Sequence, residues 1–415
     1  MLLPSPPPPL PPSPPRFLYP ALKVAYNTAL SSVLSSVSEI TKSLGTVVLE
    51  IAVPCPHYYL FGKPQRPRSL IYEQVQSLVA GLYSLVSAIC ARDSIDTEGK
   101  SSVNTRILLI AYSKDLTYSS DEKLPGKSLQ GPVIDLPTLA LSQRAWQHVF
   151  SVCSEEGELL LKRFLRLTDD SSVSRPHWSV KRVDAGVSIT SPNEGLQDVQ
   201  VLEPERKMHY SVAVGGTFDH LHAGHKLLLT MAALLLEPTS QPDQQRRIIV
   251  GITQDELLKN KKYADFLESW ENRQQSVSDF LLALLDYSAP EATPPAIYQV
   301  SKPGLNGRAV HVKLDQALEI ECVAISDPFG PTITDKSISA LVVSGETRGG
   351  GQAVNKRRED LGWPALEVFE VDVLEADEPK DLGGVKGSFN SKISSTELRR
   401  RQSEKAEQPC RNALE

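Results

Sequence analysis

The chain has 415 residues, of which 40% are hydrophobic and 23% charged, as is ordinary for a soluble globular protein of two or three domains. Its formal net charge of −6 argues against nucleic-acid binding through bulk electrostatics, so an anion site must be a local cluster of basic side chains. The five cysteines are scattered without a CxxC pair, which favours a reducing compartment.

The N-terminal segment is dominated by proline. Residues 4–15 read PSPPPPLPPSPP, so we predict that residues 1–16 form a disordered, solvated tail, although such tracts can also bind SH3-like or WW-like partners. We find no secretory signal and no apolar run of the roughly 18–20 residues that a membrane span needs. A cytoplasmic location is expected. A mitochondrial presequence stays open, because the charged residues that precede the first acidic one, Glu39, are both basic (Arg16 and Lys23).

From about Phe17 to Leu167, helix-like and strand-like segments alternate, which is typical of an α/β domain with a partly parallel sheet. Strands are predicted at Val47–Val53 and Arg106–Tyr112, and helices at Ser69–Ala91 and Leu136–Phe150. This half has no glycine-rich phosphate loop, acidic cluster or nucleophile motif, so its role stays open. Residues 168–208 are polar and are predicted to be a linker region.

A second domain is predicted for residues 209–405, followed by a tail at 406–415. Its predicted strands are Ser211–Val214, Arg247–Ile252, Ala296–Val300, Glu321–Ile325, Ala340–Ser344 and Ala365–Val371. Helices are predicted between them at Ala223–Leu236, Trp270–Leu285 and Gly350–Asp360. This alternation predicts a Rossmann-like, doubly wound parallel sheet that binds ligands at the carboxyl ends of its strands.

The most informative segment is SVAVGGTFDHLHAGH, residues 211–225. An apolar run is followed by two glycines, which let the backbone approach a ligand closely, and then by a polar turn. A long apolar helix begins at Ala223 and is ended by a proline. His222, Gly224 and His225 therefore lie at the first turn of that helix, where free N–H groups and the helix dipole favour phosphate.

Two other interpretations of this segment are open. Three histidines within six residues, His220, His222 and His225, could bind zinc. Zinc is the weaker interpretation, because beyond Asp219 no cysteine or acidic residue stands at a suitable spacing. A histidine at a helix start can also serve only as a cap. Phosphate chemistry is favoured because three related clusters follow downstream.

These clusters each lie at the end of a predicted strand or the start of a predicted helix. The lysine-rich segment DELLKNKK (255–262) follows a strand, although on composition alone it reads equally well as a solvated helix face. The segment GETRGGG (345–351) sets Arg348 among glycines, where its guanidinium can lie over a phosphate; a flexible loop is the alternative. The segment KISSTELR (392–399) predicts a helix N-terminus that can hold another anion, although alone it is an ordinary cap.

Together the clusters are rich in phosphate-binding donors, and nothing in them looks like an activated nucleophile or a two-metal carboxylate site. No protein metal ligand is therefore predicted. Such a set suits direct transfer of a nucleotidyl group to an acceptor that is already an anion. A phosphate acceptor needs no general base at pH 7, so positioning and charge neutralisation can account for catalysis.

The motifs GGTFDHLHAGHK and KISSTELR resemble the paired signatures of the HxGH nucleotidyltransferase superfamily. With DELLKNK, SDPFGP and SGETRGG between them, the chain is more closely similar to the pantetheine-phosphate adenylyltransferase family of coenzyme A synthesis, in its eukaryotic and archaeal form. The resemblance covers about residues 209–405. It implies that ATP, carrying Mg²⁺, reacts with 4′-phosphopantetheine to give dephospho-coenzyme A and pyrophosphate, by in-line attack without a covalent intermediate.

The resemblance also implies roles for residues at matching positions. His225 would stabilise the transition state, Lys259 would orient the acceptor phosphate, with Lys261 or Lys262 as alternatives, and Arg348 would contact that phosphate across the cleft. The positions implied for the nucleotide are Gly216, Thr217, Phe218, His222, Gly224, Glu359, Ser394, Ser395, Thr396 and Arg399. Those implied for 4′-phosphopantetheine are Thr217, Lys259, Asp327, Phe329 and Arg348.

The sequence departs from the family's pattern in two places. Gly351 stands where bacterial relatives have a second arginine, for which Lys356 or Arg357 is a possible replacement. Animal relatives are fused to a dephospho-coenzyme A kinase, but no GxxxxGK[ST] motif occurs in this sequence. The pathway step is therefore expected to stop at dephospho-coenzyme A.

Two classes of alternative are kept. A cytidylyltransferase or a nicotinamide-mononucleotide adenylyltransferase shares the HxGH turn. A non-catalytic nucleotide-binding scaffold, with residues 17–167 and the proline tract recruiting partners, is disfavoured because the histidine and the phosphate-binding cations are all present. A complex with other coenzyme A enzymes is open, since the next enzyme consumes the product; no nucleic-acid or membrane partner is expected.

Overall fold

The computed structural model describes most of the chain. The described residues are 1–6, 18–55, 67–112, 131–142, 144–169, 178–186, 207–239, 241, 243–288, 294–302, 306–314, 318–372, 374 and 394–412. The chain divides into two compact units: Met1–Met208 with Leu284–Ala292, and His209–Ala283 with Thr293–Glu415. We call these the N-terminal unit and the C-terminal unit and describe each by itself.

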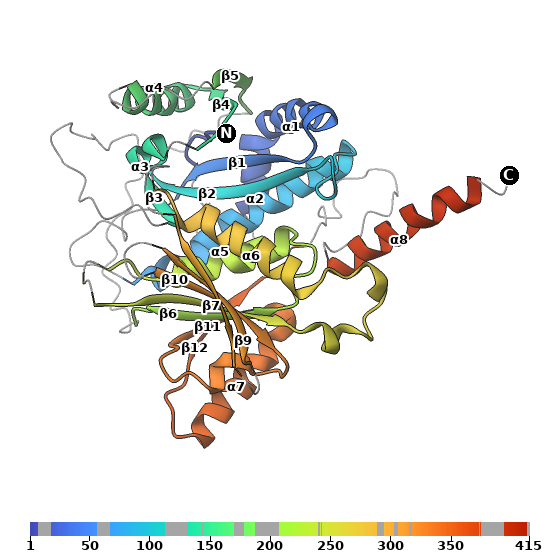
Figure 1. Ribbon diagram of the computed structural model, residues 1–415. Helices are drawn as coiled ribbons and strands as arrows, with labels where there is room; N and C mark the ends of the chain where they lie inside the picture. The colour runs from blue at the N-terminus through green and yellow to red at the C-terminus, as the bar shows by residue number, and fades with distance from the viewer. Residues whose placement is uncertain are drawn as a thin grey trace. The chain divides into compact units, whose positions relative to one another are not determined.

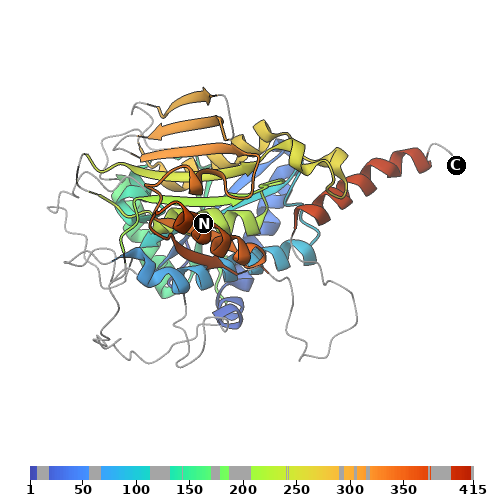
Figure 2. The same cartoon turned by 90° about the horizontal axis from the view of Figure 1, so that it is seen from below.

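The C-terminal unit is built on a seven-stranded sheet, labelled in Figure 1. Its strands are β6 (Ser211–Gly216), β7 (Arg246–Thr253), β8 (Ala296–Ser301), β9 (Arg308–Leu314), β10 (Leu318–Ile325), β11 (Ala340–Ser344) and β12 (Glu367–Val371). The strand order is β12-β11-β6-β7-β10-β9-β8, and Figure 2 shows several of these strands side by side. The five strands from β12 to β10 run parallel, which confirms an α/β fold with a parallel sheet.

The sequence predicted a wholly parallel sheet, but the sheet is mixed. Strand β9, which the sequence analysis missed, pairs antiparallel with both β10 and β8. The connection from Ser301 to Arg308 is too short for the crossover that a parallel partner requires, so the chain turns back as a hairpin. Strands β8 and β9 therefore form an antiparallel edge to the parallel sheet.

Strand β6 lies where the chain changes the direction in which it adds strands. Strands β7 and β10 are added on one side of β6, and β11 and β12 on the other. In doubly wound sheets, ligands bind outside the carboxyl ends of the strands at such a switch point. The four segments that follow β6, β7, β10 and β11 carry the motifs of the sequence, so parallel pairing brings these motifs to one edge of the sheet.

Helices cover both faces of this sheet. Helices α5 (Ala223–Leu235) and α6 (Trp270–Leu285) lie on one face, and α7 (Arg348–Asp360) lies on the other (Figure 1). Every residue of α5 from Lys226 onward is buried, which explains why this helix is apolar almost all round. On the α7 side, apolar side chains of β6, β7, β10, β11 and α7 form a shared core. This packing fixes the strand ends from which the motif-bearing turns extend.

The last helix of the C-terminal unit is α8 (Ser395–Asn412). It begins against the short helix η4 (Ala264–Phe266) and projects away from the sheet (Figure 1). The helix continues to Asn412, through residues for which the sequence suggested a tail.

The N-terminal unit holds parallel strands in two groups. They are β1 (Val47–Pro54), β2 (Val103–Ala111) and β3 (Val133–Asp135) in one group, and β4 (His148–Cys153) and β5 (Ser179–Asp184) in the other. Leu2 joins the groups, since it pairs in parallel with both Ala52 of β1 and Ser151 of β4. Leu2 and Leu3 are buried, so the prediction of a solvated tail is wrong for these first residues. Residues 7–16 of that predicted tail lie outside the described residues.

The helices of the N-terminal unit differ in part from those predicted. They are α1 (Leu18–Leu44), η2 (Arg68–Ile71), α2 (Tyr72–Arg92), α3 (Leu136–Leu141) and α4 (Glu155–Asp169). The helix predicted over 136–150 ends at Leu141, and residues 148–153 form β4, because Val149, Phe150 and Val152 suit a buried strand. Strand β5 lies within the predicted linker region and pairs with β4 along its whole length.

Residues Arg68–Arg92 are long and apolar enough to cross a membrane by length and composition, contrary to the expectation from the sequence. Within the tested window, 61% of this helix is buried in the structure. A buried core helix passes the same test, and α2 packs against α1 within the N-terminal unit. The apolar composition of α2 is therefore explained by its place in the core.

Candidate active site

The turn between β6 and α5 is closely packed and has an unusual backbone. Phe218 and His220 have positive φ angles of 52° and 47°, a region that non-glycine residues rarely adopt. The Phe218 side chain is fully buried beneath the turn. A Cβ atom on Gly216 would lie 3.1 Å from its ring, so a glycine lets the turn fold over the phenyl group. These contacts fix the position of the histidine-bearing turn relative to the end of β6.

His222 and His225 stack on each other at the start of α5. Nδ1 of His222 accepts a hydrogen bond of 3.2 Å from the Gly224 N–H and so caps the helix. The ring centroids of the two histidines are 3.9 Å apart, and their planes differ by 21°. A Cβ atom on Gly224 would lie 3.2 Å from the His222 ring, so a larger residue would press against the stack. His222 therefore does cap α5, as one of the alternatives from the sequence proposed. The cap and the stacking together place both imidazole rings at the N-terminus of the helix.

Both imidazoles of this pair are held neutral. Removal from water lowers the pKa of His222 to about 3, with smaller contributions from the charges of Lys226 and His220. Burial also lowers the pKa of His225 well below its usual value. Nδ1 of His225 is buried and has no hydrogen-bond partner among the described residues, which is uncommon for an interior polar atom. Neutral rings at a helix N-terminus can donate hydrogen bonds to an anion without repelling each other.

His220 has a different task, because its own contacts hold it in the turn. Its Nε2 lies 2.9 Å from the carbonyl oxygen of Phe266, and its backbone N–H donates to Glu268 Oε2 at 2.7 Å. Among the described residues, the three histidines of this motif do not present converging ligand atoms as a zinc site would. His220 therefore supports the loop.

The segment KISSTELR (392–399) contacts the histidine motif in the structure. Ser394 caps α8, since its hydroxyl accepts a hydrogen bond of 3.4 Å from the Glu397 N–H. The Ser395 hydroxyl donates to the carbonyl oxygen of Asp219 at 2.9 Å and lies 3.4 Å from Nε2 of His222. The N-termini of α5 and α8, both expected to bind anions, are thus neighbours.

A buried ion pair locks these two segments together. Asp219 is fully buried and pairs with Arg399, which is 2% exposed. Nε of Arg399 donates to the carbonyl oxygen of Lys262 at 3.1 Å, and its Nη2 donates to the Thr396 hydroxyl at 3.3 Å. All three guanidinium nitrogens are therefore bonded within the protein. A contact between Arg399 and ATP, as the resemblance implies, would require some of these bonds to be exchanged.

The lysine-rich motif forms an exposed turn beside this lock. Helix η3 (Asp255–Leu258) follows β7, and Lys259, Lys261 and Lys262 come after it with exposed side chains. Because Arg399 holds the backbone of the third lysine, the turn is tied to α8 and, through it, to the histidine turn. The structure brings the lysines to the site as a group, and the choice of Lys259 as the acceptor ligand stays a prediction.

One residue that organises the site was missed in the sequence. Arg273 of α6 is fully buried, and its Nη1 donates to the carbonyl oxygen of Thr217 at 2.6 Å. Its Nη2 donates to the carbonyl oxygen of Thr253 at 2.9 Å and to the Asp255 carboxylate, and its Nε donates to the carbonyl of Glu268 at 3.0 Å. One guanidinium thus fixes the turns after both β6 and β7. An arginine in the first turn of a polar helix start (WENRQQ) is normally interpreted as solvated, so no pattern in the sequence indicated this role.

The segment GETRGGG (345–351) follows β11 at the same edge of the sheet, but its contacts are separate from those of the histidine and lysine turns. Arg348 begins α7 and forms an ion pair with Glu370 of β12, while its side chain is 68% exposed. It lines a shallow pocket of about 250 Å³ with Val343, Gly351 and neighbouring residues. Glu359 is exposed near the other end of α7, about 16 Å along the helix axis. The contacts of Arg348 with the acceptor and of Glu359 with the nucleotide stay predictions.

The loop after β10 is shaped by Asp327. Its Oδ1 accepts hydrogen bonds from the N–H groups of Phe329 and Gly330, both at 2.8 Å. Its Oδ2 accepts one of 3.3 Å from the side chain of Asn306. Phe329 is partly buried against the core under α7. Both residues therefore build the loop, and their contact with 4′-phosphopantetheine stays a prediction.

Comparison with known proteins places this site in a family. Residues 213–292 match the cytidylyltransferase-like family, and residues 1–189 match a domain of unknown function. The phosphopantetheine adenylyltransferase of Saccharomyces cerevisiae is 34% identical over 215 residues, which are 52% of this chain and 55% of that protein. That of the archaeon Thermococcus gammatolerans is 30% identical over 194 residues, which are 47% of this chain and 90% of that protein. The chain belongs to the phosphopantetheine adenylyltransferase family.

Two further relatives add less to this assignment. An uncharacterized protein of Schizosaccharomyces pombe is 37% identical over 187 residues, 45% of this chain and 46% of that protein. The chain thus spans about half the length of its two fungal relatives. A crystal structure of a protein of unknown function from Archaeoglobus fulgidus is 25% identical and covers 39% of this chain and 97% of its own, at a TM-score of 0.26. That score is too low to support an argument about the adenylyltransferase fold.

Proposed function

We propose that this protein transfers AMP from ATP to 4′-phosphopantetheine, giving dephospho-coenzyme A and pyrophosphate. The observation that carries the proposal is the meeting of two helix N-termini at the stacked, neutral pair of His222 and His225. This arrangement lies at the switch point of a parallel sheet, where nucleotides bind in folds of this class. The names of the yeast and archaeal relatives support the choice of acceptor.

The proposed reaction is a single in-line displacement. A phosphate oxygen of 4′-phosphopantetheine attacks the α-phosphorus of ATP and forms the new P–O bond. The bond from that phosphorus to the bridging oxygen of the β-phosphate breaks, and pyrophosphate leaves with the electron pair. The attacking oxygen belongs to an ionised phosphate, so no proton has to be removed first. Catalysis then consists of alignment and of stabilising charge on the phosphoryl oxygens.

The described residues fit these two tasks. The backbone N–H groups at the start of α5 and α8 and the neutral rings of His222 and His225 are hydrogen-bond donors for the triphosphate. The exposed lysines after η3 supply positive charge for the acceptor phosphate. The one carboxylate within the histidine turn, Asp219, is committed to Arg399. We therefore propose that Mg²⁺ arrives with ATP as part of the substrate.

The test is an acceptor panel with the full chain. Pyrophosphate release is measured with ATP or CTP in combination with 4′-phosphopantetheine, phosphocholine, glycerol phosphate and nicotinamide mononucleotide. We expect turnover with ATP and 4′-phosphopantetheine. CTP is included because the cytidylyltransferase-like match covers the histidine motif. Turnover only with one of the other pairs would refute the proposed substrates, and no turnover with any pair would favour a non-catalytic nucleotide-binding scaffold.

A further inference from the structure

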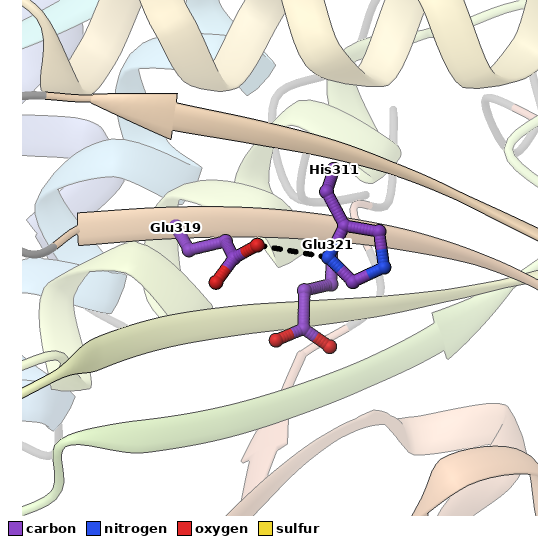
Figure 3. A group of neighbouring side chains, drawn as sticks. All are labelled: His311, Glu319 and Glu321. Atoms are coloured by element: carbon purple, nitrogen blue, oxygen red, sulfur yellow. Dashed lines mark hydrogen bonds and ion pairs between the residues drawn. The ribbon is translucent and has the colours of Figure 1, made fainter. Parts of the chain in front are cut away.

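The C-terminal unit has a second group of metal-ligating side chains, away from the edge that carries the motifs. His311 of β9 and Glu319 and Glu321 of β10 are neighbours, and Figure 3 shows the Glu319 carboxylate directed at the His311 ring with Glu321 beside them. His311 and Glu321 are partners in the antiparallel register, and Glu319 lies two residues earlier on β10, so all three share one face of the sheet. One ligand atom from each residue lies within 4.8 Å of the other two.

Neighbouring side chains hold these three residues in place. Nδ1 of His311 lies 2.9 Å from Oε1 of Glu319. Tyr298 of β8 stacks on the His311 ring, with centroids 4.8 Å apart and planes 13° apart, and its hydroxyl donates to Glu319. The three side chains are only 12–18% exposed. The ligand atoms are therefore positioned by three adjacent strands before any cation binds.

The charges around the cluster leave room for a cation. Arg247 of β7 donates to Oε1 of Glu321 at 2.9 Å, but the same guanidinium also bonds Asp335 at 2.6 Å. Lys313 is the other nearby cation, over the neighbouring tyrosine ring at 5.3 Å. Three carboxylates, those of Glu319, Glu321 and Asp335, thus face two cations.

We propose that His311, Glu319 and Glu321 form a binding site for a divalent transition metal, with Zn²⁺ as the best match. One imidazole nitrogen and two carboxylate oxygens, completed by water, form a donor set that zinc accepts. Mg²⁺ and Ca²⁺ prefer oxygen ligands alone, so they fit less well. Zinc bound at Nδ1 of His311 would replace the proton shared with Glu319, and the ring proton would then be carried by Nε2.

This proposal assigns supporting roles to the neighbouring residues. Tyr298 and Arg247 would orient the ligand carboxylates from outside the coordination shell, as such partners do in known metal sites. The metal would link β9 to β10, and so join the antiparallel edge to the parallel sheet. Its effect is expected on the stability of this edge, independent of adenylyl transfer.

The direct test measures how many zinc ions each chain binds. The full chain is stripped with a chelator and titrated with zinc chloride, and bound equivalents are measured by equilibrium dialysis for the unmodified chain, His311→Ala and Glu319→Gln. The unmodified chain is expected to bind one equivalent more than either variant, in the presence of excess Mg²⁺. The difference is diagnostic because zinc bound non-specifically elsewhere on the chain would be the same in every sample.

Glu367→Gln is the matched control. His209 Nε2 lies 3.1 Å from Glu367 Oε2 in the same unit, and among the described residues no third ligand completes that pair. Zinc binding by Glu367→Gln should equal that of the unmodified chain. Equal zinc equivalents in the unmodified chain and in folded His311→Ala or Glu319→Gln, with folding checked by circular dichroism, would overturn the proposal.

A second readout does not depend on counting. At a hundredfold excess over its dissociation constant, zinc should raise the midpoint of thermal unfolding by about 5 °C in the unmodified chain and in Glu367→Gln. His311→Ala should show no such shift. Adenylyl transfer by folded His311→Ala should be unchanged, because this cluster lies outside the proposed nucleotide site. A zinc-dependent shift of the same size in His311→Ala would contradict the assignment.

Discussion

Replacing Arg273 with lysine is expected to lower stability and also to slow catalysis in the molecules that remain folded. The guanidinium donates to the carbonyl oxygens of Thr217, Thr253 and Glu268 and to the Asp255 carboxylate. A lysine ammonium on its flexible stem cannot span these acceptors in the same way. Each buried carbonyl left without a donor costs about 1–3 kcal/mol of unfolding free energy. A shift of the Thr217 turn by about 1 Å is enough to lower kcat/KM by up to about 10²-fold.

Arg358→Lys provides the matched control. Arg358 of α7 is 1% exposed, as deeply buried as Arg273, and it also binds backbone carbonyl oxygens. Those acceptors are Thr332, Asp335, Lys336, Ile338 and Pro364, all remote in sequence from the histidine and lysine turns. Arg358→Lys should therefore lose a similar amount of stability while the rate per folded molecule stays close to normal.

The assay compares the two variants at equal folded fraction. Urea unfolding gives the stability of each variant, and pyrophosphate release with ATP and 4′-phosphopantetheine gives kcat and KM at a temperature where both remain folded. The expected result is a loss of about 10- to 100-fold in kcat/KM for Arg273→Lys alone. If both variants lose activity only in proportion to their unfolded fraction, Arg273 is structural and the positioning argument fails.

Three further predictions concern the site directly. His225→Ala should lower turnover at least about 10²-fold, as loss of one transition-state donor does, and a near-normal pyrophosphate release rate would count against the role of this ring. Lys259→Ala should raise the KM for 4′-phosphopantetheine and lower kcat; if Lys261→Ala does so instead, the acceptor ligand is reassigned. The pKa of His222 is about 3 in the folded protein and 6.5 in the unfolded chain. Between these two values the unfolded chain binds a proton that the folded protein does not bind, so the free energy of unfolding should fall as the pH drops below 6.5. The loss should approach about 1.4 kcal/mol per pH unit, and His222→Gln should weaken this dependence in urea unfolding at pH 7 and pH 5.

The sequence predicted most reliably the parts of the C-terminal unit where pattern and packing agree. The strand Ala340–Ser344 and the helix Trp270–Leu285 have the predicted bounds. Each is an uninterrupted periodic segment that ends at a turn, so local preference and burial lead to the same boundary. The parallel strands β6 and β7 end at one edge of the sheet, which is why the histidine and lysine motifs that follow them could be expected to lie close together.

Prediction failed where contacts distant in sequence decide the structure. Residues 148–150 were predicted as the end of a helix, but they suit a strand, and β5, some thirty residues later, provides the parallel partner that lets β4 form. Leu2 and Leu3 precede a proline tract and would be solvated on composition alone, yet pairing with Ala52 and Ser151 places them in the core. No local pattern contains such long-range pairing.

The residues that fix the site were hidden for a related reason. Motif reasoning selects side chains by the chemistry they can offer to a ligand, and Arg399 was accordingly assigned to ATP. In the structure its charge is used inside the protein, against Asp219 and the backbone of the lysine turn. Arg273 shows the same use of a cation, on carbonyl groups that every sequence possesses and that no motif can reveal.

The site divides two tasks between different basic residues. Arg273 and Arg399 are buried and saturated by protein acceptors, so they set where the turns lie. His222 and His225 are uncharged, so the fold does not have to bear repelling charges where the triphosphate is expected to bind. Positive potential is then available from helix N-termini and from exposed lysines, and under the proposed function also from the cation that ATP would carry. Because each buried arginine fixes more than one turn, its loss should displace several ligand contacts at once, whereas loss of a lysine removes only one.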